Sequence, residues 1–168
     1  MELIDVYNSN GEKTGKVVKR SIRNEEFKYN EHIGVSIIYI ENSKGEFLIQ
    51  KVSKEKGNIY SFTGGHINHD ETPKNAIIRE VKEEIGLDIK NENIIDLGYI
   101  CVDFPVRFIF YLKKDVDINK LILQKEEVES VRFMTIEEIK KLIDEGKIHQ
   151  AHSHILEKVL EHKKKIGD

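Results

Sequence analysis

The segment from Thr72 to Gly86 constrains the fold most strongly, because both ends of a helix are marked in it. Thr72 is a suitable N-cap, and Pro73 follows at the first helical position, where its missing N–H costs nothing. Gly86 is a natural residue to end a helix in the left-handed conformation. Between these ends, apolar residues recur at four-residue spacing, at Ile77, Val81 and Ile85. The segment therefore predicts a helix that buries one face against a core.

The opposite face of this helix is acidic. Glu80 precedes Glu83 by three residues and Glu84 by four, so the three carboxylates share one turn. Like charges at this spacing repel by a few tenths of a kcal/mol per pair, and Arg79 can neutralise only part of the cluster by bonding Glu83. Two explanations remain: a solvated acidic face, or a site for a divalent cation such as Mg²⁺ or Mn²⁺, which prefers carboxylate oxygens.

Strand-forming segments flank the helix on both sides. Turn chemistry predicts a β-hairpin from Leu3 to Arg23, and a second hairpin is expected from strands at Gly34–Ile40 and Glu46–Val52. Further strands are expected at Tyr60–Phe62, Ile94–Val102, Arg107–Lys113 and Val128–Met134. Two more amphipathic helices are predicted at Ile136–Asp144 and Ala151–Lys164. The pattern predicts an α/β fold with a mixed sheet.

Length and charge limit the kind of partner. The chain has 168 residues without an evident linker, so we expect one domain, with residues 1–30 as an N-terminal hairpin extension and 31–168 as the core. Its 27 Lys and Arg against 30 Asp and Glu give a net charge of −3, which argues against nucleic acid as a partner. The longest nearly apolar run, residues 33–40, is too short for the roughly 20 residues that cross a bilayer. We expect a small-molecule partner.

Cysteine content and the N-terminal sequence bear on location. Cys101 is the single cysteine, so no intrachain disulfide can form, and the first residues lack the basic and apolar regions of a signal peptide. These features predict a cytoplasmic protein. Cys101 is expected to be a small buried hydrophobic residue in a strand.

A fixed spacing runs through residues 65–87. It comprises Gly65, Glu71, Arg79-Glu80-Val81, Glu83-Glu84 and Gly86-Leu87. The segment, GHINHDETPKNAIIREVKEEIGL, resembles the signature of the Nudix hydrolases at every fixed position. The flanking strands and the C-terminal helix are also similar to the α/β/α sandwich of that family. The resemblance implies a hydrolase that uses Mg²⁺ or Mn²⁺ to cleave a diphosphate linkage in a nucleoside diphosphate derivative, NDP-X, to NMP and X-phosphate.

The resemblance also implies roles for particular residues. Glu80 and Glu84 would be metal ligands, and Glu83 either a third ligand or the residue that orients the attacking water. Gly64 and Gly65 are expected to form a tight bend whose carbonyl, assigned to Gly65, helps to hold the metal.

Two roles remain for residues around these ligands. Arg79 would be an orienting partner that bonds Glu83 or Glu71. Family members differ in where the general base lies. The later loop offers Glu126, Glu127 and Glu129, of which Glu127 is our choice.

Two alternatives to a hydrolase follow from the sequence. The opening segment around Asp5-Val6-Tyr7 resembles the Nudix subgroup that includes isopentenyl-diphosphate isomerase, and His32 and His66 fall where that isomerase has metal-binding histidines. The isomerase has a catalytic cysteine before its Gly-His pair, whereas this chain has Gly64 there. A non-catalytic nucleotide-sensing module is the second alternative. The intact carboxylates favour an enzyme over both.

Several features remain without an assigned function. His149, His152 and His154 lie close together, but their spacing does not place all three on one helical face, so we expect a solvated helix start. The loops that would select X carry no recognisable pattern, and a homodimer is compatible with the sequence.

Overall fold

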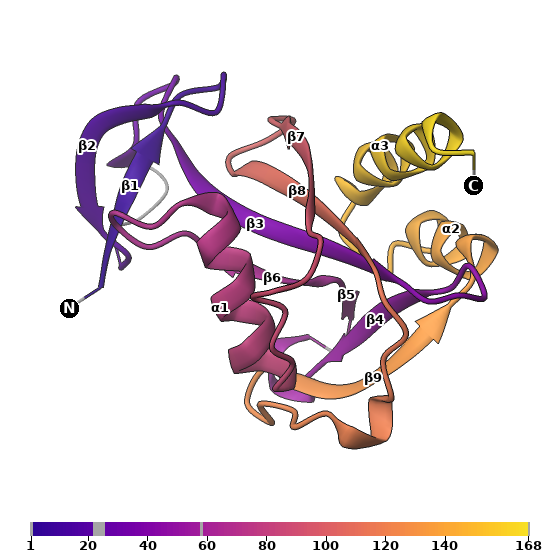
Figure 1. The fold of residues 1–168 in the computed structure, drawn as a ribbon. Helices are drawn as coiled ribbons and strands as arrows, with labels where there is room; N and C mark the ends of the chain where they lie inside the picture. The colour runs from indigo at the N-terminus through magenta and orange to yellow at the C-terminus, as the bar shows by residue number, and fades with distance from the viewer. Residues whose placement is uncertain (1, 22–25, 58, 168) are drawn as a thin grey trace.

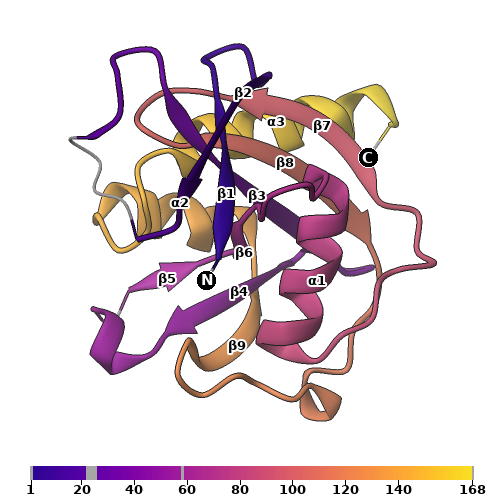
Figure 2. The same ribbon diagram turned by 90° about the vertical axis from the view of Figure 1, so that its left-hand side faces the viewer.

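Strand β3 (His32–Glu41) organises the sheet in this computed structural model, which describes residues 2–21, 26–57 and 59–167. β3 pairs in parallel with β8 and antiparallel with β1, β4 and β6. From these, β2 extends β1, β5 and β9 extend β4, and β7 extends β8. One parallel pairing among antiparallel ones confirms the predicted mixed sheet (Figures 1 and 2).

The elements follow the predicted order, with one further strand, β6, where the sequence predicts a bend. The other strands are β1 (Leu3–Tyr7), β2 (Lys13–Lys19), β4 (Phe47–Val52), β5 (Tyr60–Ser61), β6 (Thr63–His66), β7 (Ile95–Ile100), β8 (Val106–Lys113) and β9 (Val128–Met134). The α-helices are α1 (Pro73–Ile85), α2 (Ile136–Asp144) and α3 (His152–Lys165), with 3₁₀ turns at η2 (Lys54–Lys56) and η3 (Ile118–Lys120). The N-terminal hairpin is confirmed over β1 and β2; Ile22 and Arg23, at the end of the predicted segment, lie outside the described residues.

Alternate residues of β3 serve opposite faces of the sheet. Ile38 and Ile40 pack in one hydrophobic cluster with the apolar side of α1, whereas Tyr39 packs in another with α2 and α3. Side chains of a strand point alternately to the two sides, so this division follows from the period of the strand. α1 therefore covers one face and α2 and α3 the other, which confirms the α/β/α sandwich (Figure 1).

The ends of α1 lie where the sequence predicts them. The Thr72 hydroxyl accepts a hydrogen bond of 3.1 Å from the backbone N–H of Asn75, and Gly86 ends the helix with φ of 70°. α2 begins with a capping box between Thr135 and Glu138. These local signals fix where α1 and α2 start. Burial of the apolar side of α1 then leaves its acidic side facing β6.

The predicted bend at Gly64 and Gly65 is wrong. Both residues lie within β6, paired with Ile37 and Ser36 of β3. Glycine is needed there for space: a Cβ on Gly64 would overlap the backbone of β3, and a Cβ on Gly65 would overlap the carboxylate of Glu80. The turn comes later, at Asp70, which has a φ of 62°.

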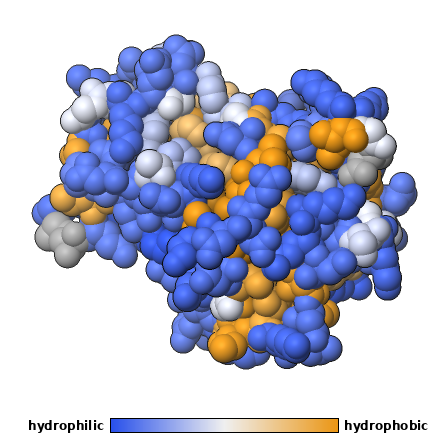
Figure 3. Space-filling model, viewed as in Figure 1, coloured by the Kyte–Doolittle hydropathy of each residue, from blue (hydrophilic) through white to orange (hydrophobic). Residues whose placement is uncertain are grey.

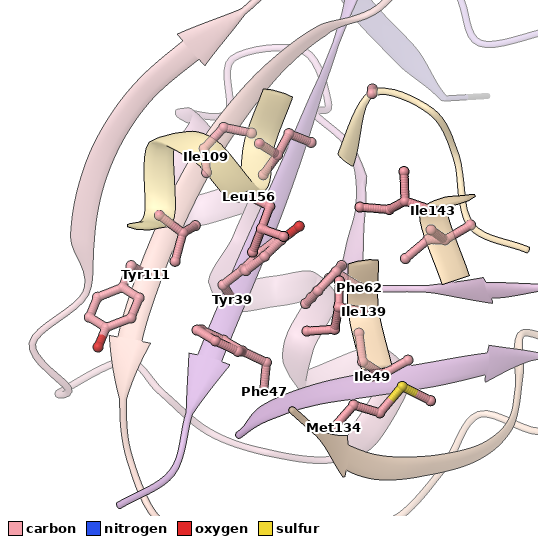
Figure 4. Close-up of a cluster of buried hydrophobic side chains, with 14 residues drawn as sticks. Tyr39, Phe47, Ile49, Phe62, Ile109, Tyr111, Met134, Ile139, Ile143 and Leu156 are labelled. Atoms are coloured by element: carbon pink, nitrogen blue, oxygen red, sulfur yellow. The ribbon is translucent and has the colours of Figure 1, made fainter. Parts of the chain in front are cut away.

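The prediction of a solvated helix start is wrong for His152. Its side chain, at the start of α3, is buried against the sheet, where its Nδ1 lies 2.9 Å from the Tyr39 hydroxyl and its ring lies against Phe62. His149 and His154 are exposed, as expected. Figure 4 shows the aromatic and aliphatic side chains of this layer, with Tyr39 and Phe62 at its centre.

The surface is mainly polar. Figure 3 shows hydrophilic residues over most of the face seen in Figure 1, with hydrophobic residues gathered in a band across its middle. Within the described ranges, no helix has the length and apolar character that crossing a membrane requires.

Candidate active site

A cleft of about 490 Å³ brings the predicted site residues together. It lies where the acidic side of α1, the end of β6, η2 and the N-terminal segment meet. A volume of this size is in the range of small-molecule sites, which is about 300–1,000 Å³. Its lining includes Glu2, Arg20, Lys56, Gly64, Gly65, His66, Asn68, Arg79, Glu80, Glu83, Glu84, Gln124 and Glu127.

Arg79 is committed to other protein groups. Its Nε and Nη2 donate to the Glu71 carboxylate at 2.8 and 2.9 Å, and Nη2 also donates to the carbonyl of His66 at 3.0 Å. Its Nη1 donates to Glu80 at 2.9 Å and to Glu83 at 3.3 Å. These bonds use all five N–H groups of a guanidinium. The hydrogen bonds, first that with Glu71, raise the pKa of Arg79. The role of Arg79 as an orienting group stays a prediction.

Glu84 lies deepest of the three helix carboxylates. It is only 9% exposed, and burial is the main reason that its pKa rises to about 8. Its Oε1 accepts a hydrogen bond of 3.3 Å from the Gln50 amide. Its Oε2 is one of two buried side-chain polar atoms without a hydrogen-bond partner in the described part of the chain, the other being the Tyr7 hydroxyl. A buried, unpartnered carboxylate oxygen is the kind of group that a bound cation would satisfy.

Glu80 lies against the backbone of Gly65. A Cβ at position 65 would overlap the Glu80 carboxylate, so the absence of a side chain lets the two approach. Burial raises the pKa of Glu80 even though Arg79 opposes the shift. The carboxylates of Glu80 and Glu84 thus line one cleft beside the backbone of Gly65, and oxygen donors of this kind fit a hard cation that completes its shell with water or phosphate oxygens.

Glu83 stands apart from the other two carboxylates. Its side chain is 53% exposed at the mouth of the cleft, and Arg79 holds it by the single 3.3 Å bond. Across residues 2–21, 26–57 and 59–167, no three His, Cys, Asp or Glu side chains are gathered so that they could hold a metal ion. The fit to a cation therefore rests on Glu80, Glu84 and backbone oxygen, with Glu83 nearer to solvent.

Gln50 is a site residue that the sequence reasoning missed. It lies on β4, is 2% exposed, donates to Glu84 and accepts a hydrogen bond from the Thr63 hydroxyl. The available signal was a polar residue directly after the apolar run Phe47–Ile49. A buried amide of this kind fixes the orientation of the carboxylate that it contacts.

Of the three later glutamates, Glu127 lines the cleft. Lys56 of η2 donates to both of its carboxylate oxygens, at 2.7 and 2.6 Å. Glu126 and Glu129 border a separate hollow with Ser53 and other residues of that loop. The structure therefore places the predicted Glu127, rather than its neighbours, beside α1.

His66 and Arg20 form the opposite rim of the cleft. Arg20 Nη2 lies 3.3 Å from His66 Nδ1, and Arg20 also forms an ion pair of 2.7 Å with Glu2. Burial and then the charge of Arg20 lower the pKa of His66. His32 has a different environment: its Nδ1 lies 2.8 Å from the carbonyl of Phe104. Cys101 follows β7 rather than lying in it, is half-buried near His32, and has a pKa raised by burial.

Comparisons with known proteins agree with this fold. The NUDIX domain family matches residues 30–159. The uncharacterised Nudix hydrolase lmo0368 of Listeria monocytogenes is 36% identical over 156 residues, which cover 87% of each chain. An 8-oxo-dGTP diphosphatase of Proteus vulgaris is 34% identical over 79 residues, 46% of this chain and 68% of that protein. The crystal structure of DR0079 from Deinococcus radiodurans has a TM-score of 0.72 at 21% identity, covering 87% of this chain and 91% of the other.

The chain belongs to the Nudix family. It is a Nudix hydrolase, that is, a pyrophosphohydrolase that acts on acid anhydrides, as the signature at residues 65–87 implies. Enzymes of this family generally use divalent metal ions such as Mg²⁺ or Mn²⁺. The suggested kinship with the isopentenyl-diphosphate isomerase subgroup rests on N-terminal residues outside the matched range and stays a prediction.

Proposed function

We propose that this protein hydrolyses a nucleoside diphosphate derivative, NDP-X, to NMP and X-phosphate, with Mg²⁺ or Mn²⁺ as cofactor. The observation that carries the proposal is the unpartnered Oε2 of Glu84, buried beside Glu80 in a cleft large enough for a nucleotide. A buried carboxylate with a pKa of about 8 is costly to maintain unless a ligand uses it.

Glu80, Glu84 and the carbonyl of Gly65 would hold the metal. When bound, the cation neutralises charge on phosphate oxygens and favours ionisation of water. The protein then supplies position: Gln50 orients Glu84, and Arg79 orients Glu80 while also contacting Glu83. Because these groups are already bonded in place, they need little rearrangement when substrate arrives.

Glu83 and Glu127 are the candidates for handling the water and its proton. Glu83 is exposed in the cleft and loosely tied, so it can orient the water or serve as a third ligand. Glu127 faces α1 from the loop before β9 and is our proposed general base, a role that typically contributes 10²- to 10⁴-fold. Its contact with Lys56 holds the carboxylate in the cleft.

The partner that we propose is a small molecule. Arg20 and Lys56 flank the cleft and bring positive charge to the place where a diphosphate would lie. Contacts between the N-terminal hairpin and the signature loop support treating residues 1–168 as one domain. The cytoplasmic location and the homodimer stay predictions, to be checked by cell fractionation and by light scattering.

The test is product detection across a panel of nucleoside diphosphate derivatives and nucleoside triphosphates, with isopentenyl diphosphate included, with and without Mg²⁺. We expect Mg²⁺-dependent release of NMP from at least one NDP-X. Glu84→Gln should be inactive, and the matched change Glu157→Gln, at an exposed position of α3, should be fully active. Isomerisation of isopentenyl diphosphate, or nucleotide binding without turnover, would instead support one of the two alternatives.

A further inference from the structure

The N-terminal hairpin lies outside the residues that match the family, yet it is bonded to the loop between β6 and α1. Asp5 of β1 makes the connection, and its side chain is buried. Its Oδ1 lies 3.0 Å from His69 Nδ1, and its Oδ2 accepts a hydrogen bond of 3.1 Å from the backbone N–H of Asp70. Lys13 of β2 balances its charge at 3.2 Å. The carboxylate thus holds two successive residues of the loop.

The loop needs such support because of its backbone conformation. Asp70 has a φ of 62° and is the one non-glycine residue with positive φ in the described part of the chain. L-residues rarely adopt this conformation without contacts that stabilise it. The backbone N–H of His69 donates to the carbonyl of Leu3 at 2.9 Å, so main chain and side chain of β1 fix the same turn.

From this turn, a chain of hydrogen bonds leads to the metal-binding side of α1. The Glu71 carboxylate accepts a bond of 3.0 Å from the backbone N–H of Asn68, which closes the loop on itself. Glu71 then holds Arg79 by two bonds, and Arg79 donates to Glu80. Each link involves a charged partner, which makes the bonds short and directional.

We propose that Asp5 is a positioning residue of the active site, which fixes the loop of residues 67–71 so that Glu71 and Arg79 hold Glu80 in place for the metal. The inference rests on the metal site proposed above. It gives the hairpin a part in the reaction, because the outermost strands then determine the position of a carboxylate on α1.

Glu31 provides a matched control for Asp5. Its side chain is 11% exposed, against 8% for Asp5, and it too is bonded to a lysine of β2, Lys16 at 3.0 Å. Its other bond, from the backbone N–H of Lys28, stays within the segment before β3. A change at Glu31 therefore removes a comparable carboxylate without touching the signature loop.

The experiment compares Asp5→Asn with Glu31→Gln. Asparagine keeps the volume of Asp5 but turns one acceptor oxygen into a donor, which then faces a donor of the loop. Mn²⁺ affinity is measured by electron paramagnetic resonance, and kcat at saturating Mn²⁺ in the same preparations. We expect Asp5→Asn to weaken Mn²⁺ binding by about 10- to 100-fold, as supporting partners of metal ligands do, and Glu31→Gln to change it less than about twofold. Unchanged Mn²⁺ affinity in Asp5→Asn would overturn the proposal.

A second variant guards against loss of folding. His69→Ala removes one of the two loop bonds at a partly exposed side chain, and we expect an intermediate weakening of Mn²⁺ binding. The double variant Asp5→Asn with Glu71→Gln should bind Mn²⁺ as weakly as Glu71→Gln alone, because both act through one chain of bonds. A double variant whose loss equals the product of the single losses would show that Asp5 acts by another route.

Failure of the metal site can be told apart from failure of this inference. If Glu84→Gln left Mn²⁺ binding unchanged, the proposed metal site would be wrong, and the inference that rests on it would fall with it. Amide hydrogen exchange of the metal-free protein tests the loop itself. Asp5→Asn should speed exchange at Asp70 and Glu71 by about tenfold or more, and Glu31→Gln should not. Equal exchange in the two variants would overturn the role of Asp5 even with an intact metal site.

Discussion

Glu84 and His152 are buried ionisable groups on opposite faces of the same sheet, and they differ in how their polar atoms are satisfied. Burial is the main cause of both shifts: it raises the pKa of Glu84 to about 8 and lowers the pKa of His152 to about 3. His152 is bonded to the Tyr39 hydroxyl, whereas Glu84 keeps an oxygen without a partner. Burial thus has two outcomes in this sheet: His152 completes a core, and Glu84 keeps an unpartnered oxygen, which we propose that a cation satisfies.

The surroundings of the two groups show the same division. Near His152, the rings of Tyr39 and Phe62 stack at 3.6 Å, and α2 and α3 close over them (Figure 4). Near Glu84, the sheet offers the polar side chains of Gln50 and Thr63. Hydrophobic clusters supply stability on both faces of the sheet. The α1 side in addition buries the Glu84 carboxyl group, whose ionised form costs stability unless a cation is bound.

The largest expected effect is on activity. Glu84→Gln should lower kcat by about 10³-fold or more, because several kcal/mol of transition-state stabilisation depend on the metal that Glu84 would hold. His152→Leu should leave kcat within about twofold. Steady-state assays at saturating Mg²⁺ check both. Normal turnover in Glu84→Gln would show that Glu84, like His152, has no role in the reaction.

The second effect concerns the pH dependence of stability without metal. The folded-state pKa of Glu84 is raised from 4.5 to about 8, so its contribution is fully present below pH 4.5 and is lost as the pH rises to 8. The free energy of unfolding should fall by up to roughly 5 kcal/mol over that window, and Glu84→Gln should remove this slope. Urea unfolding in EDTA from pH 5 to pH 9 measures it. If saturating Mg²⁺ failed to stabilise the wild-type protein at pH 8, the unpartnered oxygen would not be a cation site.

The third effect is a pH dependence of stability that comes from His152 and has the opposite sign. The folded-state pKa of His152 is lowered from 6.5 to about 3, so its contribution to stability is present above pH 6.5 and is lost as the pH falls toward 3. At pH 7, His152→Leu should cost about 1–3 kcal/mol, since the Tyr39 hydroxyl is left buried and unpaired.

A double variant tests whether Tyr39 and His152 stabilise the protein through a shared hydrogen bond. Tyr39→Phe combined with His152→Leu removes both partners and should recover part of the loss, which denaturant unfolding would show. Full additivity of the two single losses would argue against a shared hydrogen bond.

Local signals in the sequence predicted the helices and most strands. Thr72, Pro73 and Gly86 act on their own turn of chain, so the ends of α1 could be placed without knowledge of its neighbours. The spacing of Glu80 and Glu84 on one turn likewise placed both carboxylates in the cleft. What these residues share is that the helix itself sets their positions.

Features that depend on distant parts of the chain were missed or wrong. The sequence predicts a bend at Gly65, because nothing near it in the chain shows that its missing side chain makes room for the Glu80 carboxylate of α1. His152 was expected in solvent because helical spacing does not reveal that Tyr39 lies beneath it. The Asp5 carboxylate accepts a hydrogen bond from the backbone N–H of Asp70, 65 residues away, and no local sequence pattern predicts such a contact. Tertiary packing decides these positions.

The smallest effect compares two helix caps, one on each face. The hydroxyl of Thr72 accepts from Asn75 at the start of α1, and that of Thr135 accepts from Glu138 at the start of α2. Thr72→Ala and Thr135→Ala should each lower the free energy of unfolding by about 1 kcal/mol, because each leaves a backbone donor of the first turn without its partner.

The two caps should differ in their effect on catalysis. Thr72 follows Glu71 directly, so loosening the first turn of α1 disturbs the carboxylate that holds Arg79. We expect kcat to fall by a few-fold, or about 1 kcal/mol, in Thr72→Ala and to stay unchanged in Thr135→Ala. Measuring unfolding and turnover on the same two preparations separates the effects. Equal losses of turnover in the two variants would mean that both faces of the sheet affect the active site through general stability. The α1 face would then have no special role in catalysis.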